Sequence, residues 1–255
     1  MLAAAEQSAT ALKPGGLWQA RQMQIVLVRH GQPEWTLDGL GVINPPLTRT
    51  GARQAQLTAD RLAAEVADGR SKPFDEVLVS PIVRAQQTAA PICAALDTTP
   101  TTAEWLAEIR NPDAWDGTPA EEIEEVFATA RHRHLDDLWD GLPGGESFRA
   151  FHRRVTSGLR RWLVAQGATP AAPFPALWNL PATDRRVLIV AHAGTNAVIL
   201  TGLLGIEPVP WEWERFVTFH ASVTELRPTA LGGAHAFSLY RLSDLSHLPT
   251  DFQTY

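Results

Sequence analysis

Ile25-Val26-Leu27-Val28-Arg29-His30-Gly31 is the stretch that decides the fold, an apolar run that stops at two basic side chains and a glycine. A short run rich in β-branched residues is typical of a buried strand in a parallel sheet. Open α/β sheets bind their ligands at the carboxyl ends of such strands, and a glycine there lets the backbone approach a ligand closely. Arg29 and His30 are therefore candidate ligand-binding residues. On this tripeptide alone, an ordinary strand end with two solvated side chains is an equal interpretation.

The same pattern recurs twice further along the chain. Residues 187–191 form a second apolar run, which ends at His192. Residues 77–79 form a third, and Arg84 follows it about one helical turn inside the next element. If the three strands run parallel, two imidazoles and two guanidiniums meet at one edge of the sheet. Such a set of donors is suited to binding a dianion.

The composition indicates a single globular domain of ordinary size. The chain has 255 residues, of which 45% are hydrophobic and 20% charged. We expect an N-terminal extension over residues 1–22 and one domain over residues 23–255, with a lid or insertion over residues 113–181. The formal net charge of -6 argues against nucleic-acid and membrane partners, because proteins that bind those polyanions usually carry a basic face.

Three features favour a soluble protein of the cytoplasm. Residues 1–22 lack the continuous apolar core of a secretory signal. Cys93 is the single cysteine, so the chain can form no internal disulfide. Residues 187–206 carry no formal charge and are about long enough to cross a bilayer, but the polar residues around His192 would be costly in lipid.

Periodicity and turn residues predict the remaining elements. Apolar side chains recur at helical spacing in four segments: residues 50–66, 120–140 (one helix or two), 147–162 and 193–204. Two closing strands are expected: residues 222–226 and 236–242. Residues 32–48 predict a long functional loop. Residues 167–181, which are rich in proline, predict a surface loop.

Six short motifs follow one another between about residues 23 and 227. They are Arg29-His30-Gly31 with Glu34-Trp35, Pro46-Leu47-Thr48 with Gly51 and Gln54-Ala55, Ser80-Pro81 with Arg84-Ala85 and Thr88-Ala89, Leu106 with Glu108 and residues 115–117, residues 143–147, and His192 with Gly194. Each motif is weak alone. In this order they resemble the histidine phosphatase superfamily, in its phosphoglycerate mutase-like branch 1, over nearly the whole chain.

The resemblance implies a role for each charged residue. It implies that His30 is the nucleophile, that Arg29, Arg84 and His192 bind the phosphoryl group, and that Glu108 is the proton donor. It implies an α/β fold, a three-layer sandwich with a mixed, mostly parallel central sheet, helices on both faces and an inserted helical or loop lid. It implies no metal and no cofactor, and a small-molecule phosphate ester as partner; a homodimer stays open.

The chemistry of the residues agrees with these implied roles. Two arginines and a histidine neutralise the dianion, which otherwise repels a nucleophile. His30 must attack as a neutral imidazole, and neighbouring cations lower its pKa. Glu108 must carry a proton to the leaving alkoxide. It can then act as base while water hydrolyses the phosphohistidine.

Four positions depart from the family pattern: Gln32, Thr36, Asn44 and Ala193. The charged residues are untouched by these departures, which therefore bear on the substrate rather than on the chemistry. Thr36, Asn44 and Ala193 are the candidate substrate-binding residues. Residues 36–47 lack the Phe-Thr-Gly-Trp element of cofactor-dependent mutases, so hydrolysis is favoured and such a mutase is the alternative.

Several other interpretations stay open. Without the resemblance, Glu108 is a surface ion-pair partner. Residues 131–137, with two histidines and two aspartates, would be the ligands of a metal-dependent hydrolase. A non-enzymatic binding module would use an exposed surface at residues 211–213. Three tryptophans would pack against a hydrophobic leaving group or in the core: Trp35, Trp115 and Trp139.

Overall fold

The structure is a computed structural model that describes residues 23–255. A mixed sheet of eight strands forms its centre. The expected extension over residues 1–22 lies outside the described residues. Across the sheet the order is β5 (Thr101–Thr102), β4 (Glu76–Val79), β8 (Arg186–Ala191), β1 (Gln24–Arg29), β9 (Val223–Leu231), β10 (Ala234–Asp244), β7 (Phe174–Asn179) and β6 (Thr169–Ala171).

Strand β1 divides the sheet into two halves. It pairs in parallel with β8 on one side and antiparallel with β9 on the other. The pairings from β5 to β1 are parallel, and those from β1 to β6 are antiparallel. The predicted mixed sheet is confirmed, but its parallel pairings are limited to one half.

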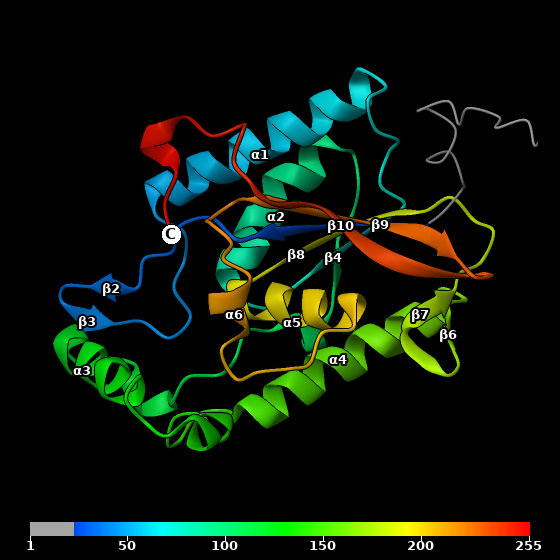
Figure 1. Ribbon diagram of the computed structural model, residues 1–255. Helices are drawn as coiled ribbons and strands as arrows, with labels where there is room; N and C mark the ends of the chain where they lie inside the picture. The colour runs from blue at the N-terminus through cyan, green and yellow to red at the C-terminus, as the bar shows by residue number, and fades with distance from the viewer. Residues whose placement is uncertain (1–22) are drawn as a thin grey trace, which may run out of the picture.

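Helices cover both faces of the sheet (Figure 1). Helices α1 (Arg49–Ala67) and α2 (Val83–Ala95) lie on one face, and α4 (Phe148–Ala165) and α5 (Ala193–Leu204) lie on the other. Side chains of β1 alternate between them, because Val26 and Val28 join the cluster under α1 and α2 while Ile25 and Leu27 join the other. Each such burial contributes roughly 1.5–3 kcal/mol. The predicted sandwich is therefore confirmed.

The register of the parallel strands brings the candidate site residues to the same edge of the sheet. Arg29 pairs with Ala191, and the backbone N–H of His30 donates to the Ala191 carbonyl at 2.9 Å. His30 and His192 therefore leave adjacent strands at the same level. Ser80 follows β4 at this edge, and its backbone N–H donates to the Val190 carbonyl.

The helices agree closely with the periodicity. The Thr48 hydroxyl accepts from the Gly51 N–H at the start of α1, and the Ser147 hydroxyl accepts from the Ala150 N–H at the start of α4. The segment 120–140 is a pair, α3 (Ala120–Ala130) and the 3₁₀ helix η3 (Leu135–Asp140). None of the helices within residues 23–255 combines the length and apolar character that a membrane span requires.

Residues 104–119 and 206–216 contain only short helical turns. These are η1 (Glu104–Leu106), η2 (Asp113–Trp115) and α6 (Glu212–Arg215). A further 3₁₀ turn, η4 (Thr250–Phe252), lies beside α1. In the expected loop over residues 32–48, β2 (Thr36–Leu37) and β3 (Leu40–Gly41) form a small hairpin next to α3 (Figure 1).

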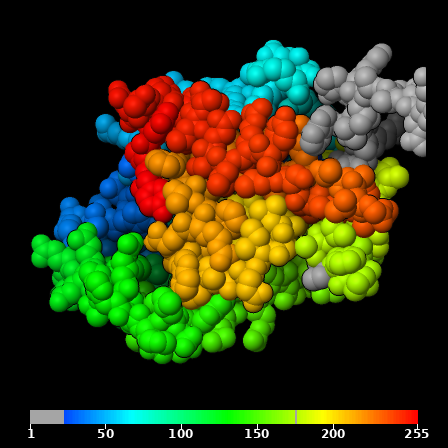
Figure 2. Space-filling view, viewed as in Figure 1, coloured from blue at the N-terminus to red at the C-terminus, as the bar shows by residue number. Residues whose placement is uncertain are grey.

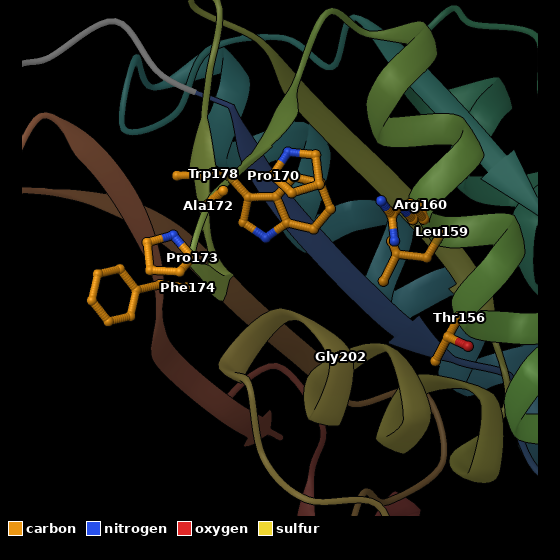
Figure 3. Close-up of a pocket in the computed structure, with 10 residues that line it drawn as sticks. Thr156, Leu159, Arg160, Pro170, Ala172, Pro173, Phe174, Trp178 and Gly202 are labelled. Atoms are coloured by element: carbon orange, nitrogen blue, oxygen red, sulfur yellow. The ribbon is translucent and has the colours of Figure 1, made fainter.

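The expectation of a surface loop over residues 167–181 is wrong, because the segment forms the hairpin β6–β7 at the edge of the sheet. A proline is tolerated on an edge strand, where its missing N–H has no ladder partner to lose. The buried Trp178 pairs with His235 and anchors the hairpin to β10. A cavity of about 350 Å³ lies between the hairpin, α4 and α5, and Leu159 and Gly202 contribute to its lining (Figure 3).

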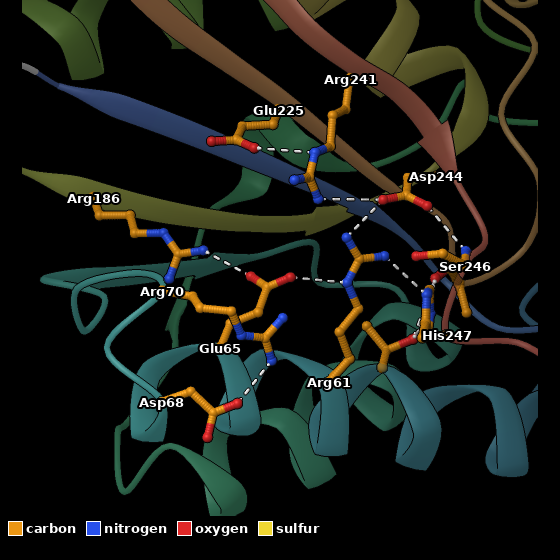
Figure 4. Close-up of polar contacts among 12 residues, drawn as sticks. Arg61, Glu65, Asp68, Arg70, Arg186, Glu225, Arg241, Asp244, Ser246 and His247 are labelled. Atoms are coloured by element: carbon orange, nitrogen blue, oxygen red, sulfur yellow. Dashed lines mark hydrogen bonds and ion pairs between the residues drawn. The ribbon is translucent and has the colours of Figure 1, made fainter. Parts of the chain in front are cut away.

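A polar network fastens α1 to the end of β10 (Figure 4). The Arg61 guanidinium lies 2.7 Å from the Asp244 carboxylate and 3.1 Å from that of Glu65, and it donates to His247 Nδ1. Burial alone would raise the pKa of Asp244, but the N–H of Ser246 and the charge of Arg61 outweigh it and lower that pKa to about 2. The ionised carboxylate therefore stabilises the folded chain.

We expect Asp244→Asn to lower the free energy of unfolding by about 1 kcal/mol at pH 7. The pKa of Asp244 falls from 3.8 to about 2 on folding, so its contribution is present above pH 4 and is lost as the pH falls towards 2. Urea unfolding at several pH values checks this. Asp68→Asn removes an exposed carboxylate paired with Arg70 and serves as the control, with a change below about 0.5 kcal/mol. Equal effects of the two substitutions would contradict the account.

Candidate active site

His30 lies at the carboxyl end of β1 and is only 2% exposed. Its Nδ1 is 2.7 Å from the Gly31 carbonyl, which can only accept, so Nδ1 carries the proton. Nε2 then bears the lone pair, and it accepts from Arg84 Nε at 3.1 Å. Burial, followed by the nearby His192, Arg84 and Arg29, holds the pKa of His30 well below its usual value. The imidazole is therefore neutral, and the hydrogen bonds to Gly31 and Arg84 fix its orientation.

Two buried guanidiniums flank His30. Arg29 donates to the Thr218 carbonyl and to His220 Nε2, the latter at 3.1 Å. The guanidinium of Arg84, from the first turn of α2, stacks on the Trp35 ring, 4.9 Å from its centroid. Burial is the main cause that lowers the pKa of each arginine, to about 10. Both side chains therefore stay charged at neutral pH.

His192 completes this cationic edge as a neutral ring, because burial, followed by Arg84 and Arg29, holds its pKa well below its usual value. It precedes α5, its Nε2 lies 2.7 Å from the Ser80 hydroxyl, and its ring centroid is 5.0 Å from that of His30. Three buried nitrogens around His30 have no hydrogen-bond partner among residues 23–255: Arg29 Nε, Arg84 Nη1 and His192 Nδ1. A buried donor without an acceptor is costly. Unpartnered nitrogens on three neighbours of one imidazole are suited to binding an anion.

Glu108 faces this cluster from the segment after η1. Its carboxylate accepts from the Gly194 N–H at 2.9 Å and the Ile109 N–H at 3.0 Å. Burial raises the pKa of Glu108, against the opposing effects of these N–H groups and of Arg84 and Arg29. A raised pKa favours the protonated form that a general acid needs. The carboxylate makes no ion pair among the described residues, which argues against the surface ion-pair alternative.

Gly194 leaves the space that the Glu108 carboxylate occupies. A Cβ at position 194 would lie 2.6 Å from Glu108 Oε1, which is closer than real Cβ contacts. Arg154 from α4 holds the same segment, because it donates to the carbonyls of Ala107 at 2.9 Å and Glu108 at 3.2 Å. The position of the Glu108 carboxylate is therefore fixed by α5 on one side and by α4 on the other.

A chain of hydrogen bonds behind the cationic edge could not be predicted from the sequence. His220 Nδ1 is 3.0 Å from the Thr254 hydroxyl, which accepts from Gln54 Nε2 at 2.8 Å. Gln54 Oε1 accepts from the Gln32 N–H at 2.7 Å. Burial, followed by Arg29, lowers the pKa of His220 to about 3, so it remains a neutral acceptor. Gln54 belonged to a quoted motif, but no local pattern marked His220 or Thr254.

The three candidate substrate-binding residues lie in different places. Ala193 lines a cavity of about 550 Å³ that opens onto Glu108. Thr36 lines a smaller adjoining cavity of about 350 Å³ under the β2–β3 hairpin. Asn44 accepts from the Val83 N–H at 3.1 Å, so it caps α2, the helix that carries Arg84. Asn44 lies outside the lining of both cavities.

Two of the three candidate tryptophans line a cavity, and the third does not. Trp35 lines both cavities, and Trp115 lines the smaller one against Phe127, with ring centroids 5.2 Å apart. Trp139 stacks under the Arg149 guanidinium and lines neither cavity.

The expectation of an exposed surface at residues 211–213 is wrong. Glu212 is 2% exposed, because its carboxylate accepts from the Thr201 hydroxyl and the Val209 N–H. Trp211 and Trp213 on either side are half-buried and line the larger cavity. This segment therefore contributes to the wall of the candidate site.

Residues 131–137 lie at the rim of the larger cavity, and both of their histidines are exposed. His134 lies 3.5 Å from Asp136, while Arg133 donates to the Gly141 carbonyl. Over residues 23–255, no three side chains among histidine, cysteine, aspartate and glutamate are grouped as ligands for a metal ion.

Comparison with known proteins gives one family and several relatives. The model of the histidine phosphatase superfamily (branch 1) matches residues 25–236. An adenosylcobalamin/alpha-ribazole phosphatase of Salmonella typhi is 31% identical over 187 residues, which are 72% of this chain and 81% of the relative. A probable phosphoglycerate mutase of Yersinia enterocolitica is 29% identical over 73% of this chain and 77% of the relative.

Solved structures agree with the fold. A mycobacterial glucosyl-3-phosphoglycerate phosphatase is 26% identical, with a TM-score of 0.60 over 86% of this chain and 98% of the other. An alpha-ribazole phosphatase from Shigella flexneri has a TM-score of 0.64 at 23% identity, over 87% of this chain and 96% of the other, and shows likeness of fold.

The unpartnered donors predict that orthophosphate binds beside His30. At a phosphate concentration about 100-fold above Kd, Tm should rise by roughly 5 °C. Arg84→Ala should abolish this rise, while Arg53→Ala, an exposed arginine of α1, should keep it. Differential scanning calorimetry of the three proteins in phosphate and in chloride measures the effect. A rise retained in Arg84→Ala would place the anion elsewhere.

Proposed function

The chain belongs to branch 1 of the histidine phosphatase superfamily, and from that premise we propose that it hydrolyses small-molecule phosphate monoesters through a phosphohistidine on His30. The observation that carries the proposal is a set of three buried nitrogens without protein partners on the residues that surround the neutral His30: Arg29 Nε, Arg84 Nη1 and His192 Nδ1. Relatives with phosphatase names support hydrolysis.

In the first step, the His30 Nε2 lone pair attacks phosphorus, and the bond from phosphorus to the ester oxygen breaks. The two arginines and His192 bind the equatorial oxygens, whose charge they stabilise throughout the transfer. Glu108 donates its proton to the departing oxygen. The products of this step are the free alcohol and phosphorylated His30.

In the second step, Glu108 is the base. It takes a proton from a water molecule, which attacks phosphorus as the bond to His30 Nε2 breaks. Orthophosphate forms and the imidazole returns to its neutral state. The hydrogen bond from Nδ1 to the Gly31 carbonyl at 2.7 Å keeps the same tautomer through the cycle.

A cofactor-dependent mutase is the second candidate, and the mutase named among the relatives supports it. A mutase transfers the phosphoryl group of its phosphohistidine to a second hydroxyl of a bound monophosphate, and it must hold the resulting bisphosphate until the other phosphoryl group returns to the histidine. We favour hydrolysis because the segment between Thr36 and Leu47 is a short hairpin that lacks the mutase element. Formation of 2-phosphoglycerate from 3-phosphoglycerate and a bisphosphoglycerate primer, faster than phosphate release, would favour the mutase.

Phosphate release from p-nitrophenyl phosphate in excess EDTA tests the proposal. We expect turnover by the wild type and a loss of at least about 1,000-fold in His30→Asn, because the variant has no nucleophile. His132→Asn, which alters a residue of the alternative metal site, should retain turnover. Full activity in His30→Asn would overturn the proposal, and loss of activity in EDTA would favour the metal-dependent alternative.

The role of Glu108 predicts a dependence on the leaving group. Glu108→Gln should slow the hydrolysis of ethyl phosphate by at least about 100-fold, because its alkoxide needs a proton. The loss with p-nitrophenyl phosphate should be below about tenfold, since nitrophenolate leaves without one. Glu104→Gln, a nearby exposed carboxylate, is the control. Equal losses for both esters in steady-state kcat/KM would contradict the acid role.

A further inference from the structure

The segment formed by α3 and η3 carries apolar side chains that the core does not bury. None of the residues of α3 and η3 is buried, although Ile123, Val126 and Phe127 form an apolar face on α3. Phe127 is 46% exposed and Leu135 is 62% exposed. An amphipathic helix usually buries such a face against a core. In Figure 2 this green segment and the blue β2–β3 hairpin lie side by side at one end of the molecule.

Two of these apolar side chains, Phe127 and Leu135, line the cavity that reaches Glu108. The cavity of about 550 Å³ has Glu108 at its inner end and Phe127 in its wall. Because Glu108 protonates the leaving oxygen, the carbon attached to that oxygen must enter this cavity. Its volume is in the range that accommodates a drug-sized molecule.

Aromatic rings make up much of the wall. Trp35, Phe127, Phe148 and Trp213 line the cavity, and Phe148 and Trp213 are packed together with centroids 5.0 Å apart. These four rings come from four separate segments of the chain. Flat rings at several orientations favour another ring system through stacked and edge-to-face contacts.

Most of the charged side chains of the wall are paired with one another, with Arg154 or with backbone carbonyls. Glu146 is paired with Arg154 at 2.7 Å, and Arg131 lies 3.6 Å from Glu214. Arg133 donates to backbone carbonyls at the end of η3. A sugar or glycerate placed against the aromatic rings would lose hydrogen bonds to water without replacing them there, which disfavours polyhydroxylated substrates.

We propose that the substrate of this site is the monophosphate of a bulky, ring-containing apolar alcohol. The inference rests on the proposed phosphatase function and specifies its substrate class. The phosphoryl group lies against Arg29, Arg84 and His192, the ester oxygen faces Glu108, and the apolar alcohol lies among Trp35, Phe127 and the rings beyond. Arg110, exposed at the rim, faces solvent beyond the alcohol.

Two esters with the same kind of leaving oxygen test the proposal. Ethyl phosphate and 2-(2-naphthyl)ethyl phosphate both release a primary alkoxide, so the chemical step is matched and only the apolar group differs. We expect kcat/KM to be at least about 30-fold higher for the naphthyl ester, as burial of its rings requires. Glycerol 3-phosphate should be as poor a substrate as ethyl phosphate.

Two variants test whether the preference for the naphthyl ester arises in the cavity beside Glu108. Phe127→Ala should lower kcat/KM for the naphthyl ester by about tenfold, mainly through KM, and lower it much less for ethyl phosphate. Phe174→Ala removes a ring that is 61% exposed on β7. Phe174 lines the cavity between the β6–β7 hairpin, α4 and α5 (Figure 3), and it does not line the cavity beside Glu108. This control should leave the ratio between the two esters unchanged.

The outcomes separate the substrate class from the function. Equal kcat/KM for the two alkyl esters, with His30-dependent hydrolysis of both, would overturn the substrate class and leave the phosphatase function standing. A ratio that Phe174→Ala lowers as much as Phe127→Ala would also overturn it. If Phe127→Ala instead dissociates a dimer without changing the ratio, a second copy covers this face. No hydrolysis of any ester, including p-nitrophenyl phosphate, would refute the function itself.

Discussion

Two buried guanidiniums and two buried imidazoles lie together at one edge of the sheet, and the rest of the site follows from their electrostatics. Within residues 23–255, Arg29 and Arg84 form no ion pair with a carboxylate; they donate instead to neutral acceptors such as the Thr218 carbonyl, His220 and His30. Burying charge without a counter-charge is costly. A bound dianion would supply the counter-charge. Burial, reinforced by the nearby guanidiniums, holds the pKa of His30 well below its usual value, so the imidazole is neutral. The same two arginines thus favour both anion binding and a neutral His30.

The two halves of the sheet position different residues of the site. The parallel half sets the register that brings His30 and His192 to one level, and it provides the turn from β4 into α2 that carries Arg84. The antiparallel half supports Arg29, because Thr218 and His220 precede β9. Glu108 lies on a segment without a long helix or strand, and the contacts of α4 and α5 fix its position. In contrast, α3 and η3, which contribute to the wall of the cavity beside Glu108, contain no buried residue.

Much of the fold and of the charged cluster could be predicted from the sequence, because buried parallel strands are continuous apolar runs and their carboxyl ends are easy to find. Arg29, His30, Arg84 and His192 all follow such runs and do meet in the structure. The hairpin at residues 167–181 was missed because its prolines resemble a loop, while its pairing depends on contacts with β10 that no local pattern records. His220 and Thr254 were missed for a similar reason, since they reach the site from the loop before β9 and from the segment after η4. The expected lid over residues 113–181 includes α4, whose Phe151 and Leu163 are buried in the core, so we propose that the lid is limited to the segment before α4.

The account depends on His30 becoming phosphorylated during turnover. The most direct measurement is rapid mixing of the enzyme with a ³²P-labelled ester, a quench at neutral or alkaline pH that preserves a bond between phosphorus and nitrogen, and mapping of the label by peptide mass spectrometry. The account predicts a transient phosphoryl group on His30 that appears with the first released alcohol and decays at the rate of orthophosphate formation. Label on any other residue, or turnover at full rate with no labelled protein at any time, would contradict it.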